Sequence, residues 1–88
     1  MASQPTRIIW SESSVAEFRE LDFETREQIL RRIVLLHTNP LLYEVETVGP
    51  WAGLRRFQAL RVMVFYTFWS PNNTLYIEAI VPASSGRR

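Results

Sequence analysis

The chain has 88 residues, of which 47% are apolar, and its formal net charge is +1. This length fits one domain and is too short for two ordinary ones. Cysteine is absent, which excludes a disulfide framework and a thiolate metal site. No apolar run approaches the roughly 20 residues of a membrane span, and none near the start has signal-peptide length. We therefore expect a soluble, cytoplasmic protein without a membrane partner.

The ten basic side chains are all arginine, and they divide the chain into halves of opposite charge. Residues 1–48 hold five arginines and eight acidic residues, a net −3, whereas residues 49–88 hold five arginines and one acidic residue, a net +4. The absence of lysine is explained either by genomic base composition or by a need for planar cations that bind phosphate or carboxylate. The second half is a candidate surface for an anionic partner.

The first half of the chain predicts one strand and two helices. Residues 7–10 are β-branched and aromatic and predict a short strand. Residues 11–14 supply helix-capping side chains, and Ser14 and Glu17 have capping-box spacing, which together predict a helix that ends near Leu21. The inward residues of this helix are expected to be Val15, Phe18 and Leu21.

A second, longer helix is predicted to begin after a cap at Asp22 and to end before Asn39–Pro40, because proline disfavours the helical conformation in the residue before it. Its apolar stripe has helical spacing and comprises Ile29, Leu30, Ile33, Val34 and His37. Glu27 and Arg31 are spaced for an ion pair on the outer face. The two helices share almost no linker and form an αα-hairpin.

The second half of the chain predicts three strands, over residues 54–57, 60–69 and 74–81. Residues 70–73 form a strong turn signal between the last two, whereas residues 41–50 read either as a loop or as a loop with a partial helical turn. If Trp69 pairs with Thr74, one face holds four apolar pairs: Phe68 with Leu75, Tyr66 with Ile77, Val64 with Ala79, and Val62 with Val81. The other, partly open face then holds Thr67 with Tyr76, Phe65 with Glu78, and Met63 with Ile80.

A chain reversal around Gln58–Ala59 would place Arg56 directly opposite Arg61 on the open face. Like charges in this position destabilise a sheet, so an anionic partner is a natural explanation. The alternative is that both guanidinium groups extend into water, or that Glu78 or Glu46 neutralises one of them.

Three motifs in this order resemble the RelE/ParE superfamily of toxins from type II toxin–antitoxin systems. They are the helix motif Ser14–Leu21, the spaced aliphatics Ile29, Ile33 and Leu36 before Asn39–Pro40, and the strand motif Arg56–Met63. The resemblance extends from about Arg7 to Val81. The sequence departs from the family pattern in the turn glycine, which is replaced within Gln58–Ala59. Val64 stands at a usual tyrosine, and no histidine or tyrosine follows the last strand.

The resemblance implies an α+β fold, with an αα-hairpin packed on a mostly antiparallel four-stranded sheet in the order β-α-α-β-β-β. We expect one toxin domain over residues 1–88, with flexible tails at 1–5 and 83–88. The implied function is that of a toxin which cleaves mRNA on the ribosome, with a cognate antitoxin as partner. The alternatives are a ParE-like inhibitor of DNA gyrase, which is not an enzyme, or an inactive toxin-like interaction module.

RNA cleavage of this kind requires charge stabilisation at phosphorus and proton transfer, but no metal or cofactor. Arg56 and Arg61 are the candidates for charge stabilisation, because arginine has too high a pKa to transfer protons. Glu78 is the candidate base, with Glu44 and Glu46 as alternatives, and Tyr76 is a candidate acid or stacking residue. The candidate RNA-binding residues are Arg56, Arg61, Arg87, Arg88 and Trp51. For these side chains the alternatives are ion pairing and surface or core packing, and a structural role is favoured for the single histidine, His37.

Overall fold

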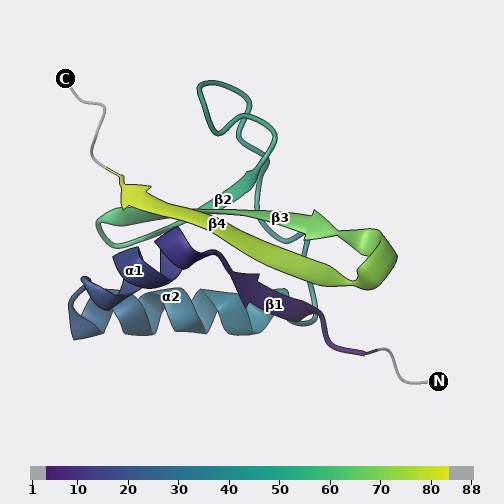
Figure 1. Cartoon of the computed structure of the whole chain (residues 1–88), viewed down its shortest axis with the longest axis horizontal. Coiled ribbons are helices and arrows are strands. Elements are labelled where there is room, and N and C mark those ends of the chain that lie inside the picture. Colours follow the sequence, from purple (N-terminus) through teal and green to yellow (C-terminus); the bar gives the residue numbers. More distant parts are fainter. Residues whose placement is uncertain (1–3, 84–88) are drawn as a thin grey trace.

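The computed structural model describes residues 4–83, which form two helices on one face of a four-stranded sheet (Figure 1). The elements are β1 (Arg7–Trp10), α1 (Glu12–Arg19), α2 (Phe23–Leu36), β2 (Arg55–Ala59), β3 (Val62–Trp69), a 3₁₀ turn η1 (Ser70–Asn72) and β4 (Thr74–Pro82). The strand order is β1-β4-β3-β2, and only β1 and β4 run parallel. The predicted element order and the mostly antiparallel sheet are therefore confirmed.

Ser11, the first residue of the predicted capping segment 11–14, caps helix α1, so the capping box placed at Ser14 is wrong. The extended backbone of Ser11 lets its Oγ accept a hydrogen bond from the Ser14 amide at 3.1 Å. Ser14 lies inside the first turn and is fully buried, where its hydroxyl donates to the Ser11 carbonyl at 2.9 Å and approaches the Ile77 carbonyl at 3.2 Å. A small polar residue is needed at this position because helix α1 meets strand β4 there.

Helix α2 buries a narrower stripe than the sequence predicts. The buried side chains are Thr25, Ile29, Ile33 and Leu36. Leu30 and Val34, which were expected inside, are 46% and 64% exposed. Only one row of α2 side chains packs against the sheet, and no described element covers the adjacent row that contains Leu30 and Val34. The predicted pair between Glu27 and Arg31 forms at 3.8 Å on the exposed face.

The β3–β4 register follows the prediction for four pairs, from Trp69 with Thr74 to Tyr66 with Ile77, and then shifts at a β-bulge. Glu78 is the extra residue of the bulge. Beyond it the pairs are Phe65 with Ala79, Val64 with Ile80, Met63 with Val81 and Val62 with Pro82, so the four pairs predicted there are wrong. The shift turns Ile80 toward the core in place of the smaller Ala79, and an isoleucine gains more from burial than an alanine does.

The β2–β3 hairpin reverses at Leu60–Arg61 rather than at Gln58–Ala59. Ala59 pairs with Val62, and Arg56 pairs with Phe65, so the predicted Arg56–Arg61 pairing is wrong. The physical reason is that Ala59 and the preceding Phe57 are both buried. Alternation along a strand brings both side chains to the core only if the turn comes after Ala59.

Leu60 occupies this turn with φ of +54°, a value that a glycine adopts more easily. We expect Leu60→Gly to raise the free energy of unfolding by about 1 kcal/mol, because it relieves backbone strain and removes a side chain that is already half exposed. Urea unfolding would measure the difference. Leu60→Ala is the control, because it shortens the side chain and keeps the strain. Equal stabilities of the two variants would contradict the prediction.

Tyr66 is fully buried in the core between the helices and the sheet, and its hydroxyl has no hydrogen-bond partner within residues 4–83. Burial raises the pKa of the Tyr66 hydroxyl above its ordinary value of 10.0, although the nearby Tyr43 backbone acts in the opposite direction. The unfolded chain therefore ionises at lower pH than the folded one, so stability falls as pH rises above about 10.

We expect Tyr66→Phe to be about 1 kcal/mol more stable than the wild type at pH 7, because it removes an unpartnered buried hydroxyl. The difference in unfolding free energy between the variant and the wild type should grow between pH 9 and pH 11, because the Tyr66 hydroxyl of the unfolded chain ionises there and the phenylalanine has no such group. Denaturant unfolding at these pH values measures it. A stability difference that does not change with pH would show that the Tyr66 hydroxyl is not buried in the folded state.

Candidate nucleic-acid interface

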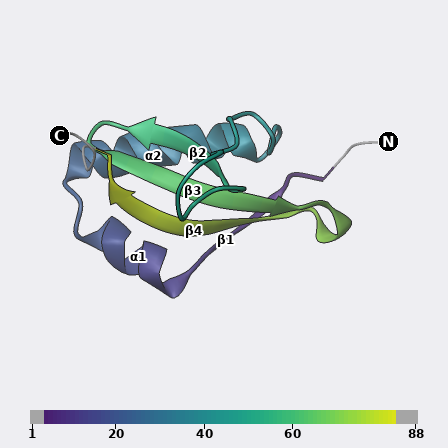
Figure 2. The same ribbon diagram turned by 90° about the horizontal axis from the view of Figure 1, so that it is seen from above.

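A loop covers part of the sheet face that the helices leave free. Residues 44–54, here called the strap, rise on the side of the sheet opposite the helices and cross over β2 and β3 (Figures 1 and 2). Backbone hydrogen bonds hold the strap: Glu46 N–H donates to the Leu54 carbonyl at 2.7 Å, Gly53 N–H to the Glu46 carbonyl at 2.8 Å, and Arg56 N–H to the Glu44 carbonyl at 3.0 Å. The expected open face is therefore covered around Phe65 and stays open beside β1 and β4 and at the Trp69 end of β3.

Arg56 lies under the strap and pairs with two of its carboxylates. Its Nε is 2.7 Å from Oε1 of Glu46, and its Nη2 is 3.8 Å from Oε1 of Glu44. The short contact is an ion pair rather than an aligned hydrogen bond. The side chain of Glu46 is 19% exposed and that of Arg56 33%, so water reaches the pair only in part. The predicted alternative, in which Glu46 neutralises an arginine of the face, is confirmed.

Trp51 stacks on Phe65, with 5.1 Å between the ring centroids and 17° between the ring planes. Phe65 points to the open face of β3 and is nevertheless buried, because the strap carries Trp51 over it. One face of the indole is therefore occupied by packing. Arg55, on the other side of β2, anchors the start of the same loop by donating from Nη1 to the Tyr43 carbonyl at 2.7 Å.

Arg61 lies away from Arg56, in the exposed hairpin turn. It lines a hollow with Asp22, Glu24 and Thr25 at the N-terminal end of α2, on the helix side of the sheet. The Thr25 hydroxyl donates to Asp22 Oδ1 at 2.5 Å and lowers the pKa of that carboxyl, and the charge of Arg61 contributes in the same direction. The structure therefore separates the two arginines that the sequence placed together.

Glu78 and Tyr76 lie on the part of the face that the strap leaves open. Glu78 Oε2 accepts a hydrogen bond from the Thr67 hydroxyl at 3.0 Å, and Thr67 pairs with Tyr76 across the strands. Within residues 4–83, Glu78 forms no ion pair with Arg56 or Arg61, contrary to the alternative considered for it. The predicted RNA-binding residues Arg87 and Arg88 lie outside the described residues.

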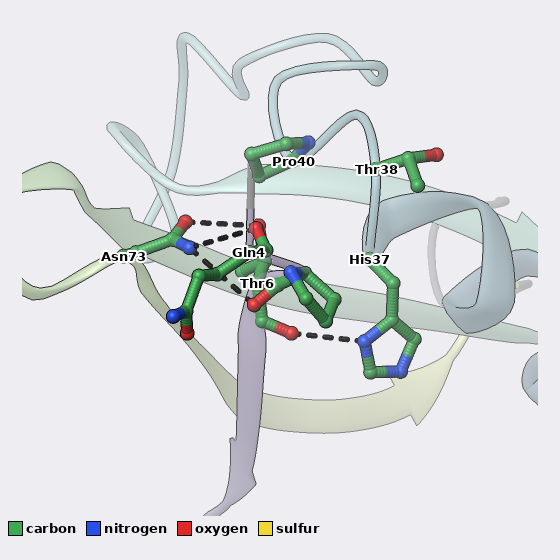
Figure 3. A pocket seen from close by; sticks show the side chains of 7 residues that line it. Gln4, Thr6, His37, Thr38, Pro40 and Asn73 are labelled. Carbon is green, nitrogen blue, oxygen red and sulfur yellow. Dashed lines mark hydrogen bonds between the residues drawn. The ribbon is translucent and has the colours of Figure 1, made fainter. Parts of the chain in front are cut away.

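His37 takes part in a connection at the far end of the molecule. Its Nδ1 is 2.9 Å from the Thr6 carbonyl, and Thr6 N–H donates to the His37 carbonyl at 2.8 Å, so the end of α2 is tied to the segment before β1 (Figure 3). Asn73 Oδ1 accepts a hydrogen bond from the Thr6 hydroxyl at 3.1 Å, and Asn73 Nδ2 donates to the Gln4 and Pro5 carbonyls. These residues line a hollow of about 520 Å³. The described part of the chain contains no group of three acidic or histidine side chains that could hold a metal ion.

The fold is that of the RelE/ParE toxins. The RelE chain of the intact Escherichia coli RelBE toxin–antitoxin complex superposes with a TM-score of 0.75 at 13% identity, covering 89% of this chain and 96% of that one. RelE of the Pyrococcus horikoshii RelE–RelB complex gives 0.77 at 16% identity, covering 93% and 99%. The YoeB/ParE toxin of Agrobacterium tumefaciens gives 0.71 at 15% identity, covering 88% and 98%.

The likeness is one of fold, because these identities are low. No protein-family model matches the sequence, and no curated protein matches it. Among residues 4–83, no helix is long and apolar enough to cross a membrane.

Proposed function

We propose that this chain is the toxin of a toxin–antitoxin pair and cleaves mRNA on the ribosome. The shared fold supports the toxin assignment, and two of the similar structures are complexes with an antitoxin. An antitoxin is accordingly the proposed partner, and the ribosome and mRNA are the proposed targets.

The observation that carries the nuclease proposal is the contact between Glu46 and Arg56 on the open face. The Glu46 carboxylate accepts the proton of a ribose 2′-hydroxyl, and the 2′-oxygen attacks the adjacent phosphorus. The bond from phosphorus to the 5′-oxygen breaks, which leaves a 2′,3′-cyclic phosphate. Arg56 stabilises the negative charge of the phosphorane. The 5′-oxygen takes a proton from water or from Tyr76.

Not all of the other predicted site residues take part in this proposed mechanism. Arg61 has no part in it, because its side chain faces the α2 end on the helix side of the sheet. Trp51 borders the pair from the strap, and Glu78 lies further along the open face. Arg87 and Arg88 are proposed only as additional phosphate ligands.

The experiment that tests this function uses translating ribosomes. The protein is incubated with them, and the 5′ ends of the mRNA are mapped. New 5′ ends inside coding sequences are expected with the wild type, and fewer with Glu46→Gln. Intact mRNA at a protein dose that arrests growth would refute the nuclease assignment.

A second candidate function is inhibition of DNA gyrase without catalysis. Two observations favour gyrase inhibition: two carboxylates neutralise Arg56, and Arg61 lies far from Arg56. Together they reduce the positive charge that is available to bind a phosphate. A supercoiling assay separates the two functions, since unchanged gyrase activity at saturating protein would exclude the inhibitor. Harmless expression in a bacterial host would instead support an inactive interaction module.

A further inference from the structure

We propose that the uncovered part of the open sheet face binds single-stranded RNA, with bases stacked on Trp69 and Tyr76 and with phosphate bound by Arg7. These three residues are here called the platform. The proposal rests on the proposed function only in taking RNA as the ligand, and it requires no cleavage.

Three adjacent strands bring the platform together. Arg7 on β1 is opposite Thr74 on β4, which is opposite Trp69 on β3. The next row along the sheet consists of Ile9, Tyr76 and Thr67. The residues that alternate with these, Ile8, Phe68, Leu75 and Ile77, pack in the core. Because side chains alternate along a strand, the platform side chains lie on the face away from the helices.

Trp69 differs from the other two tryptophans in having no ring partner among the described residues. Trp10 packs edge-on against Phe18 at 5.0 Å and Trp51 stacks on Phe65, whereas Trp69 is 58% exposed. Arg7 is likewise exposed and forms no ion pair within residues 4–83. An exposed indole and a half-buried phenol ring beside a free guanidinium group on a sheet fit unstacked bases and their phosphates. The bases of a duplex are stacked on one another and cannot use such rings.

The charges on this face give the bound strand a direction across the sheet. Glu78 is two residues from Tyr76, on the side away from Trp69, and its carboxylate is held by Thr67. A carboxylate repels phosphate and accepts hydrogen bonds from the amino groups of bases. The RNA backbone therefore lies toward Arg7, and base edges point toward Glu78.

The platform continues the face that contains the Glu46–Arg56 pair. Arg56 is opposite Phe65, and Trp69 lies four residues further along β3, which is about 13 Å at the rise of a strand. A strand stacked on the platform would thus enter the space beside the strap, which gives the platform the role of positioning RNA.

The test is the binding of a fluorescein-labelled single-stranded oligoribonucleotide without ribosomes, followed by fluorescence anisotropy. Trp69→Ala and Tyr76→Ala are each expected to weaken binding about tenfold, and Trp69→Phe to retain most of it. Arg7→Gln is expected to weaken binding and to reduce its dependence on salt. Phe23→Ala is the matched control, because Phe23 is 70% exposed but lies on α2, and it should bind like the wild type. Circular dichroism verifies folding of each variant.

Three results would overturn the platform: no binding of the oligoribonucleotide by the wild type, equal binding by the wild type and both alanine variants, or equal affinity for a duplex of the same sequence. Loss of capture of the antitoxin by Trp69→Ala, with RNA binding unchanged, would show that the surface serves a protein partner. If RNA binding depends on Trp69 but mRNA is not cleaved on ribosomes, the nuclease function is refuted and the platform is supported. If mRNA is cleaved but RNA binding is independent of Trp69, the platform is refuted and the nuclease function is supported.

Discussion

Replacement of Arg56 by alanine is expected to lower the rate of mRNA cleavage on ribosomes about 100-fold, because the variant loses the cation that stabilises the phosphorane. Arg61→Ala is the matched control. It removes the same charge from an exposed position at the hairpin turn and should change the rate less than about threefold. The rates are measured as the accumulation of new mRNA 5′ ends under single-turnover conditions.

The two carboxylate contacts complicate the interpretation of Arg56→Ala, because the variant leaves Glu46 partly buried without its cation. Glu46→Gln avoids this problem, since glutamine keeps the size and can accept a hydrogen bond from Arg56 but cannot take up a proton near neutral pH. It should lose cleavage while its unfolding free energy stays within about 1 kcal/mol of the wild type. Full activity of both Arg56→Ala and Glu46→Gln, or loss of activity in Arg61→Ala alone, would contradict the assigned pair.

Much of the fold is predictable from local signals. The strand at residues 7–10 lies where its β-branched residues indicate it, and the Ser70–Asn73 turn fixes the first four pairs of the last hairpin. Proline and asparagine favour this turn through local conformation alone: Asn73 adopts the left-handed conformation that asparagine tolerates well.

The remaining register depends on contacts that a pattern of alternation does not contain. A bulge at Glu78 reverses the alternation for the rest of β4, and the selection between the two registers depends on whether Ile80 or Ala79 reaches the core. The turn at Leu60–Arg61 is similarly determined by burial of Ala59 in spite of an unfavourable φ at Leu60. In both cases packing outweighs the local preference.

The candidate site was predictable only in part. Arg56 and the alternative partner Glu46 were identified from residue types, but the nine positions between them gave no indication that the loop folds back over the sheet. The strap depends on hydrogen bonds that span Glu46 to Leu54 and on the stacking of Trp51 on Phe65, and both are tertiary contacts. The sequence predicts Trp69 only as the strand residue that pairs with Thr74, and its lack of a ring partner among the described residues is visible only in the structure.

The largest expected effect on stability is that of Ile29→Ala, which should lower the free energy of unfolding by about 3 kcal/mol. Ile29 is fully buried at the centre of the α2 contact with the sheet, so the variant leaves a cavity under the helix. A domain of this size has only about 5–10 kcal/mol of stability in total, and the loss corresponds to a fall in Tm of roughly 10–25 °C.

Leu30→Ala is the adjacent control, and it decides between the two descriptions of the α2 stripe. The helical spacing of apolar residues in the sequence placed Leu30 inside with Ile29, whereas the structure leaves Leu30 46% exposed. The variant should therefore lose less than about 1 kcal/mol. Losses of similar size in the two variants, measured by thermal and urea unfolding, would mean that Leu30 is covered in solution. In that case the outer row of α2 would belong to an interface, and the loss from Leu30→Ala would increase with protein concentration, because self-association stabilises the folded state by mass action.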